Sequence, residues 1–396
     1  MQPGIIVQHG RLPTRSRELV RCDITAIIGF TLLPPPAQRD ENSPLPGDFI
    51  EVILQREADL WNYPDHQVFD AATRRAVRSY FVNGGEILHL ISVYLERFED
   101  LQVTATDAGV LRPLLDRLRT EDDISILAVP AAAYLPCEVS RVGDVTADVE
   151  PLYDLLLAHC QEMHNRFLII DPPSGLHDEL LERWVSSFRA RNERTRSYGA
   201  IYYPWLCEGQ TRFPPSASVA GVYVRTEKER GEYGVAWPPA NTPVYGVTHP
   251  EVELDWMEAG ALAEQSINPI ILQAGRGLVI FGARTLSRQS SYAFVNSRRV
   301  VSLIMEQIRR DSEWAVFETN NPHLWDVLHR DIRYRLEQFW RGGLLAGKRA
   351  GEEYAVLCDH TNNPRTSLDM GQVNVEVKLR PVGTTEQIVI DLRLGG

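Results

Sequence analysis

The pattern closest to a known chemical motif is a glycine-rich run near the end of the chain. Gly342-Gly343-Leu344-Leu345-Ala346-Gly347-Lys348 has the glycine and lysine spacing of a phosphate-binding P-loop. Arg349 then stands where a Ser or Thr would have to bind magnesium. The run also follows an expected helix, whereas a P-loop follows a strand. A glycine-rich turn after a helix therefore explains it better than a phosphate site.

Other candidate sites are weaker still. His159 and His164 flank Cys160 but are five residues apart, which does not place both on one helical face as a zinc pair requires. Gly275-Arg276-Gly277 has Ile280 where a dinucleotide fingerprint needs its third glycine. The sequence has no Gly-x-Ser-x-Gly elbow, and none of its cysteines has a local activating pattern. We therefore assign no catalytic, metal or cofactor-binding residue and expect no enzyme and no cofactor.

Two arginine pairs, Arg298-Arg299 and Arg309-Arg310, give one expected helix basic ends. The simpler interpretation is a helix with exposed charge. The alternative is contact with an acidic partner, and the sequence leaves both open.

Composition excludes several classes of protein. The chain has 396 residues with a net charge of −12, which argues against a protein whose main role is to bind nucleic acid. No signal-peptide pattern and no apolar run of about 20 residues is present, so we expect no membrane insertion. The five scattered cysteines do not suggest a disulfide framework, and we expect synthesis in a reducing cytoplasm.

The elements that precede residue 247 alternate between strands and helices. Short apolar runs predict strands at 24–30, 87–95, 124–129, 167–170 and 198–203. Apolar residues at helical spacing predict helices at 69–81, 152–163 and 181–188. Such alternation is typical of a mostly parallel sheet that is covered by helices.

The last third of the chain has a different pattern. We expect a strand at 278–282, a helix at 294–310, and a second helix that Asn321 caps and Pro322 begins. A strand at 354–358 follows. Two alternating strands close the chain, the second with Ile388, Ile390, Leu392 and Leu394 on one face. Because the last strand has one apolar face, it must find the edge of a sheet.

We therefore predict an α/β fold with an α+β C-terminal part. An N-terminal arm covers 1–20, a mostly parallel sheet flanked by helices covers 21–247, a C-terminal domain covers 248–384, and an arm strand covers 385–396.

From Phe213 onward the chain resembles the contractile tail sheath family of phages, tailocins and extracellular contractile injection systems. The matching residues run in order over about 180 positions: Pro214-Pro215-Ser216, Val219-Ala220-Gly221-Val222-Tyr223, Arg225-Thr226, Arg230-Gly231, Pro239-Ala240-Asn241, Asn268-Pro269-Ile270, Gly275-Arg276-Gly277, Gly282-Ala283-Arg284-Thr285-Leu286, Val295-Asn296, Arg298-Arg299, Trp314-Ala315-Val316-Phe317-Glu318, Asn320, Leu324-Trp325, Gly343-Leu344-Leu345, Gly347, Cys358-Asp359, Asn363-Pro364 and Gly371. The N-terminal part matches more loosely, and Thr384-Thr385-Glu386-Gln387 departs from the family's usual Pro-Ala-Glu-Phe.

The resemblance implies a mechanical subunit. Sheath subunits form hexameric rings that stack helically around an inner tube, are linked by exchanged terminal strands, and contract to drive the tube through a target envelope. The implied partners are other copies of the chain, the tube protein, and baseplate and tail-terminator proteins, with paralogous sheath subunits as an open question. The implied location is a particle assembled in the bacterial cytoplasm, as part of a phage tail or of a phage-tail-like particle that can be released.

On this basis we predict that Ile388, Ile390, Leu392 and Leu394 dock into a neighbouring subunit's C-terminal sheet, and that Ile5 and Val7 contribute from another chain. Lys348 and Arg349 are the candidate tube contacts. Two alternatives remain: an α/β enzyme that binds phosphate or a nucleotide at the Gly342–Arg349 turn, and a structural tube protein that does not contract.

Overall fold

The computed structural model describes residues 19–41, 43–63, 66–101, 108–140, 145–383 and 388–394. The strands are β1 (Thr25–Leu32), β2 (Phe49–Leu54), β3 (Leu88–Leu95), β4 (Ile126–Ala128), β5 (Cys137–Val139), β6 (Val145–Ala147), β7 (Phe167–Ile170), β8 (Gly199–Tyr203), β9 (Leu206–Glu208), β10 (Thr211–Phe213), β11 (Thr242–Pro243), β12 (His249–Pro250), β13 (Ile267–Gln273), β14 (Gly277–Ile280), β15 (Tyr354–Leu357), β16 (Val373–Leu379) and β17 (Ile388–Leu394). The α-helices are α1 (Glu57–Trp61), α2 (Ala71–Val82), α3 (Arg112–Thr120), α4 (Glu150–Met163), α5 (Asp178–Arg191), α6 (Ser216–Arg230), α7 (Trp256–Glu264), α8 (Val295–Ser312), α9 (Pro322–Arg341) and α10 (Arg365–Asp369).

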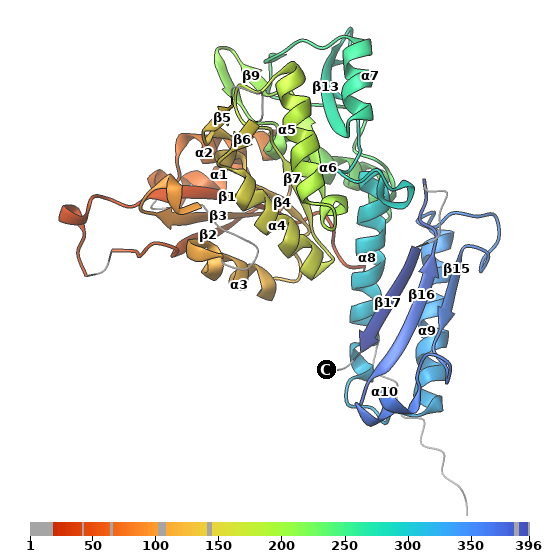
Figure 1. Ribbon diagram of the computed structural model, residues 1–396. Coiled ribbons are helices and arrows are strands. Elements are labelled where there is room, and N and C mark those ends of the chain that lie inside the picture. Colours follow the sequence, from red (N-terminus) through yellow and green to blue (C-terminus); the bar gives the residue numbers. More distant parts are fainter. Residues whose placement is uncertain are drawn as a thin grey trace, which may run out of the picture.

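A nine-stranded mixed sheet lies at the centre of the larger part of the molecule (Figure 1). Its strand order is β11-β14-β13-β8-β7-β4-β1-β3-β2. The six strands from β13 to β3 run parallel to one another, and β2, β14 and β11 pair antiparallel at the two ends. The predicted α/β fold with a mostly parallel sheet is therefore confirmed.

Helices cover both faces of this sheet. Apolar residues of α3, α4 and α5 pack with Ala26 and Ile28 of β1 on one face, and those of α2 and α6 pack with Ile27 on the other. Because both faces are buried, the strands read as continuous apolar runs and lack alternation. This explains why their positions were visible in the sequence.

A smaller C-terminal part stands beside the large sheet (Figure 1). It contains α8, α9 and the antiparallel sheet β15-β16-β17, and one apolar core joins the helices to the strands. The helix α8 belongs to both parts, because Val295 packs in the core of the large sheet while Val301 and Ile308 pack in the C-terminal core.

The large sheet includes strands on both sides of residue 247. The antiparallel pair β13 and β14 continues it to Ile280, and β13 lies directly beside β8. The division of the chain into domains at 247 stays a prediction. The elements that periodicity did not predict include β2, α3, α6, α7 and β13.

Candidate assembly interface

The C-terminal sheet rests on a helix that begins where the sequence indicated. The Asn321 side chain accepts a hydrogen bond from the Leu324 amide at 3.0 Å, and Pro322 occupies the first turn of α9. The apolar residues Leu328, Ile332 and Leu336 of α9 are then buried in the C-terminal core. Capping and periodicity together place one rigid helix behind the sheet.

The last two strands pair in a register that matches their apolar residues. The pairs are Leu379 with Ile388, Val377 with Ile390, Val375 with Leu392, and Val373 with Leu394. The four partners on β16 are all buried. The register therefore sets the predicted arm residues of β17 opposite the buried row of the C-terminal sheet.

In the single chain β17 pairs with its own β16 (Figure 1). Residues 384–387, which connect the two strands, lie outside the described residues. An antiparallel ladder needs only a complementary strand, and the same backbone bonds form whether that strand comes from the same chain or from another. Docking of β17 on a neighbouring copy stays a prediction.

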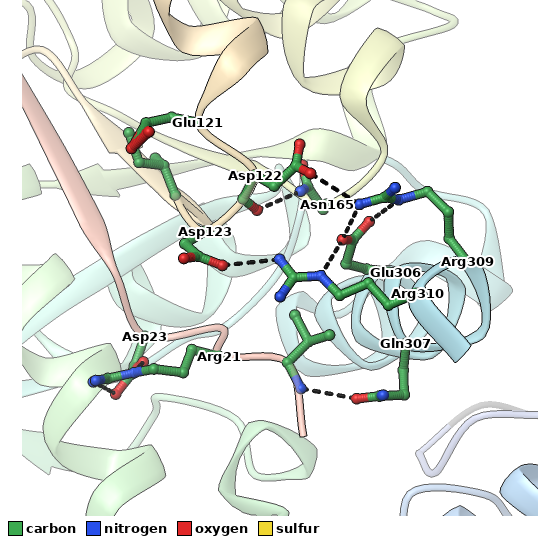
Figure 2. A network of polar contacts seen from close by, with 12 residues as sticks. Arg21, Asp23, Glu121, Asp122, Asp123, Asn165, Glu306, Gln307, Arg309 and Arg310 are labelled. Atoms are coloured by element: carbon green, nitrogen blue, oxygen red, sulfur yellow. Dashed lines mark hydrogen bonds and ion pairs between the residues drawn. The ribbon is translucent and has the colours of Figure 1, made fainter. Parts of the chain in front are cut away.

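The predicted N-terminal contacts Ile5 and Val7 lie outside the described residues. The described chain begins at Leu19, and the Val20 amide donates to the Gln307 side chain of α8 at 2.8 Å (Figure 2). The N-terminal segment therefore reaches the large sheet from beside α8.

The two candidate tube contacts lie in an exposed turn between α9 and β15. The side chain of Arg349 is 83% exposed and lies 3.8 Å from the Glu352 carboxylate, and Lys348 is also exposed. As expected, the glycine-rich run directly follows a helix. Its backbone is tied to the end of β16, because the Val382 amide donates to the Leu344 carbonyl at 2.8 Å. This hydrogen bond holds the turn beside the residues at which the chain leaves β16 towards β17.

The expectation of exposed charge is wrong for the first arginine pair of α8. Arg298 and Arg299 are both buried. Arg299 forms an ion pair with Glu227 of α6 and donates to the Cys22 carbonyl. Burial raises the pKa of Glu227 above its ordinary value, while the Arg299 charge opposes that shift. The Arg299–Glu227 ion pair thus links α8 to α6, which packs on the large sheet.

The second arginine pair of α8 contacts an acidic loop of the same chain. Arg309 lies 3.0 Å from Asp122 and Arg310 lies 2.8 Å from Asp123, both in the loop between α3 and β4 (Figure 2). Glu306 accepts hydrogen bonds from both arginines, at 2.7 and 2.8 Å. Sequence reasoning anticipated an acidic partner as one alternative but missed its position, although the run Glu121-Asp122-Asp123 carried the signal.

His159, which belongs to the weak zinc pattern in the sequence, is an ordinary buried residue. His159 is buried on α4 and contacts the Arg166 guanidinium, and its pKa falls to about 3 because burial and the nearby charge disfavour protonation. Over the ranges that the structure covers, no group of three or more His, Cys, Asp or Glu side chains could hold a metal ion.

None of the described helices is both long and apolar enough to cross a bilayer.

The C-terminal part matches a known domain family. The family model for the phage tail sheath C-terminal domain matches residues 287–395. These residues are therefore similar to a tail sheath C-terminal domain. They contain α8, α9 and the three-stranded sheet, including both strands of the β16–β17 pair.

Relatives with tail sheath names match larger parts of the chain. A putative prophage major tail sheath protein of Pseudomonas aeruginosa is 25% identical over 224 residues, which are 55% of this chain and 55% of that protein. The tail sheath protein of Enterobacteria phage T4 is 25% identical over 179 residues, 45% of this chain and 26% of that protein. The chain thus spans about half or less of the length of these curated relatives.

Solved structures match nearly the whole chain. The helical sheath of the anti-feeding prophage in its contracted state is 22% identical with a TM-score of 0.69, covering 98% of each chain. The contracted sheath complex of the PVC extracellular contractile injection system is 24% identical with a TM-score of 0.69, covering 96% of this chain and 94% of that chain. This likeness establishes the fold, and the resemblance to contractile tail sheath proteins is confirmed.

Proposed function

We propose that this chain is the structural subunit of a contractile tail sheath, which polymerises helically around an inner tube and contracts. The observation that carries the proposal is the sheath C-terminal domain, whose last strand places four apolar residues opposite the buried row of β16. In the polymer, β17 of one copy would complete the sheet of the next.

Strand exchange accounts for a helical polymer. The donor strand and the acceptor edge are different surfaces, so the contact is head-to-tail and propagates from copy to copy. Hexameric rings, an inner tube and baseplate and terminator proteins are the partners we propose, with assembly in the bacterial cytoplasm before the particle acts outside it. Contraction would release free energy as subunits repack in a metastable lattice, without a nucleotide.

Removal of Glu386–Gly396 tests the proposal directly. The truncated chain loses β17 and should remain a folded monomer that does not polymerise. Removal of only Gly395 and Gly396 leaves β17 whole and should polymerise like the full chain. Electron microscopy and sedimentation measure both, and long sheath-like tubes from the shorter chain would refute the role of β17.

Contact with the tube is a separate part of the proposal. Lys348 and Arg349 lie in an exposed turn and are available to an acidic tube surface. Changing both to Glu should reduce assembly around the tube without affecting sheath polymers that form alone. Unchanged tube-bound assembly would remove these two residues from the contact.

Two further measurements separate the alternatives. Saturable ATP binding is expected only if the Gly342–Arg349 turn serves an enzyme. Two helical states that differ in pitch and diameter are expected only from a contractile sheath, whereas a static tube shows one. The tail sheath relatives favour the structural role.

A further inference from the structure

An arginine-lined groove opens on the large domain, far from the C-terminal sheet. Its volume is about 490 Å³, and it lies between α1, the start of α2, the turn after β4, and β10. We call it the arginine groove. Its lining includes Trp61, Arg74, Arg75, Arg78, Tyr134 and Arg212.

Four arginines line the groove, with Glu57 as the one carboxylate among its lining residues. Arg75 and Arg78 share one carboxylate, that of Glu208, at 2.5 and 3.1 Å. Arg212 pairs with Glu251 at 2.6 Å and its side chain is still 53% exposed, as is that of Arg78. Each guanidinium carries five N–H donors, so one shared carboxylate leaves several free to bind further acceptors.

Exposed aromatic rings flank these arginines. Trp61 is 52% exposed and Tyr134 is 43% exposed. Exposed arginine and aromatic side chains together are typical of the centres of protein interfaces. The groove is therefore suited to a partner that carries both carboxylates and large apolar side chains.

Such a surface stands on another part of the same chain. At the start of α7, Trp256 is 65% exposed and Met257 is 84% exposed. The exposed carboxylates of Glu253, Asp255 and Glu258 surround them, and residues 253–258 contain no Lys or Arg. We call these residues, 253–258, the acidic knob.

The acidic knob is held rigidly. The Asp255 side chain accepts from the Met257 and Glu258 amides at 2.7 and 2.8 Å, and the Glu258 carboxylate accepts from the Asp255 amide at 2.8 Å. Trp256 packs edge-on against Phe281, with ring centroids 4.8 Å apart. A preorganised knob loses little conformational entropy when it binds, so its exposed Trp and Met are suited to docking.

Arg212 of the groove pairs with Glu251, two residues before the knob, while the helices of the groove and the knob stand by different strands of the large sheet. The knob stands beside β13, while α1 and α2 stand by β1, β2 and β3 (Figure 1). Four strand spacings separate β13 from β1 in the sheet order, about 19 Å at about 4.8 Å each. Trp256 and Met257 of the knob stay exposed in the single chain, as do Arg78 and Arg212 of the groove, so both surfaces are open to another molecule.

We propose that the acidic knob of one copy docks into the arginine groove of a second copy. The contact joins two different surfaces, so it is head-to-tail and repeats along a polymer. It goes beyond the exchange of terminal strands, although it rests on the proposed self-assembly for its place in a lattice. It gives the large domains a contact of their own, separate from the C-terminal sheet.

Cross-linking between two variants tests the contact. Chains with Thr211→Cys, at the groove, are mixed with chains with Met257→Cys, at the knob, under mild oxidation. A covalent dimer of the two variants is expected at least tenfold above the level in wild-type chains, which have the same native cysteines. Leu45→Cys, exposed on a loop, mixed with Met257→Cys is the matched control and should stay at background.

Charge exchange tests the same contact through assembly. Arg78→Glu and Glu253→Arg should each raise the protein concentration needed for polymers roughly tenfold, because each leaves like charges facing each other. Both changes in one chain should restore it. Arg183→Glu reverses an exposed charge on α5 that belongs to neither surface, and it should have no effect.

The outcomes separate this inference from the proposed function. Polymers that form normally with either reversal and without the cross-link would overturn the inference and leave strand exchange intact. Because the cross-link is scored as a dimer, it decides the contact even if wild-type chains fail to polymerise, a result that would contradict the proposed function instead.

Discussion

Asp171, at the end of β7, is a buried carboxyl group that the assembly surfaces do not use. One of its oxygens accepts from the Ser216 amide at 2.8 Å, and within the described part of the chain its Oδ2 atom has no hydrogen-bond partner. Burial raises the pKa of Asp171 to about 7. The folded protein therefore favours the protonated form at a pH where the unfolded chain has lost the proton.

This shift predicts a loss of stability as pH rises. Between about pH 4 and 7 the folded state holds a proton that the unfolded state has released, so the free energy of unfolding falls with pH across that window. Asp171→Asn cannot titrate and should remove the loss, which is at most about 1.4 kcal/mol per pH unit. Urea unfolding of both proteins at several pH values measures it, and parallel curves would contradict the assignment.

The titration of His159 changes the free energy of unfolding with pH in the opposite direction to that of Asp171. Its pKa of about 3 lies below the ordinary value because of burial, so the unfolded chain takes up the proton first as pH falls. Its contribution to stability is present above about pH 6.5 and is lost towards pH 3. For this reason the Asp171 effect must be measured as a difference between variant and wild type.

At the scale of elements, α8 connects the two parts of the molecule. Its first turns are tied to the large domain by the buried Arg299–Glu227 pair, and the Arg298 guanidinium lies 4.5 Å from the Tyr198 ring centre. Its later turns pack on α9 through Val301 and Ile304. One helix thus shares two cores, which couples the position of the C-terminal part to the large sheet.

The buried pair should be costly to break from one side. Arg299→Met leaves the Glu227 carboxylate buried without its partner and is expected to destabilise the protein by about 3–5 kcal/mol. Adding Glu227→Gln should recover part of that loss. Arg183→Met, which breaks an exposed pair with Glu179, should change stability by less than about 0.5 kcal/mol. Denaturant unfolding measures the free energy of unfolding of each variant. Equal losses at Arg299 and Arg183 would show that the buried ion pair stabilises the protein no more than the exposed one.

Among the helices, those with a single buried face were the easiest to predict. The helix α9 shows its apolar row and its cap in the sequence, and both are present as expected. The helix α6 was not predicted because it is buried around its whole circumference, so no apolar periodicity marks it. Its buried residues include Ala217, Val219, Val222 and Val224. A helix surrounded by protein carries too little contrast between faces to be recognised from one sequence.

At the scale of the whole molecule, partly exposed charges join the C-terminal part to the part that contains the large sheet. The Arg309 and Arg310 side chains are 42% and 32% exposed where they meet Asp122 and Asp123 (Figure 2). Exposed ion pairs contribute little each and are screened by salt. The junction should therefore loosen without unfolding when these charges are changed.

Asp122→Lys with Asp123→Lys should increase hydrogen exchange at the Val20 amide roughly tenfold. That amide is bonded to Gln307 on the same helix and reports contact across the junction. High salt should act on the wild type in the same direction. Asp116→Lys, whose pair with Arg119 lies within α3, is the control and should leave exchange at Val20 unchanged. Slow exchange in the double variant would show that the ion pairs do not hold the junction.

The sequence by itself determined about half of the strands and helices and the alternating apolar rows of β16 and β17. Those features depend on residues that are near neighbours in the chain, so period and caps reveal them. Only the tertiary structure decided that Arg299 is buried against Glu227 and that Arg309 meets Asp122, 187 residues away. Which charge meets which depends on how elements pack, because carboxylates and guanidiniums have the same local sequence pattern whether they face water or each other.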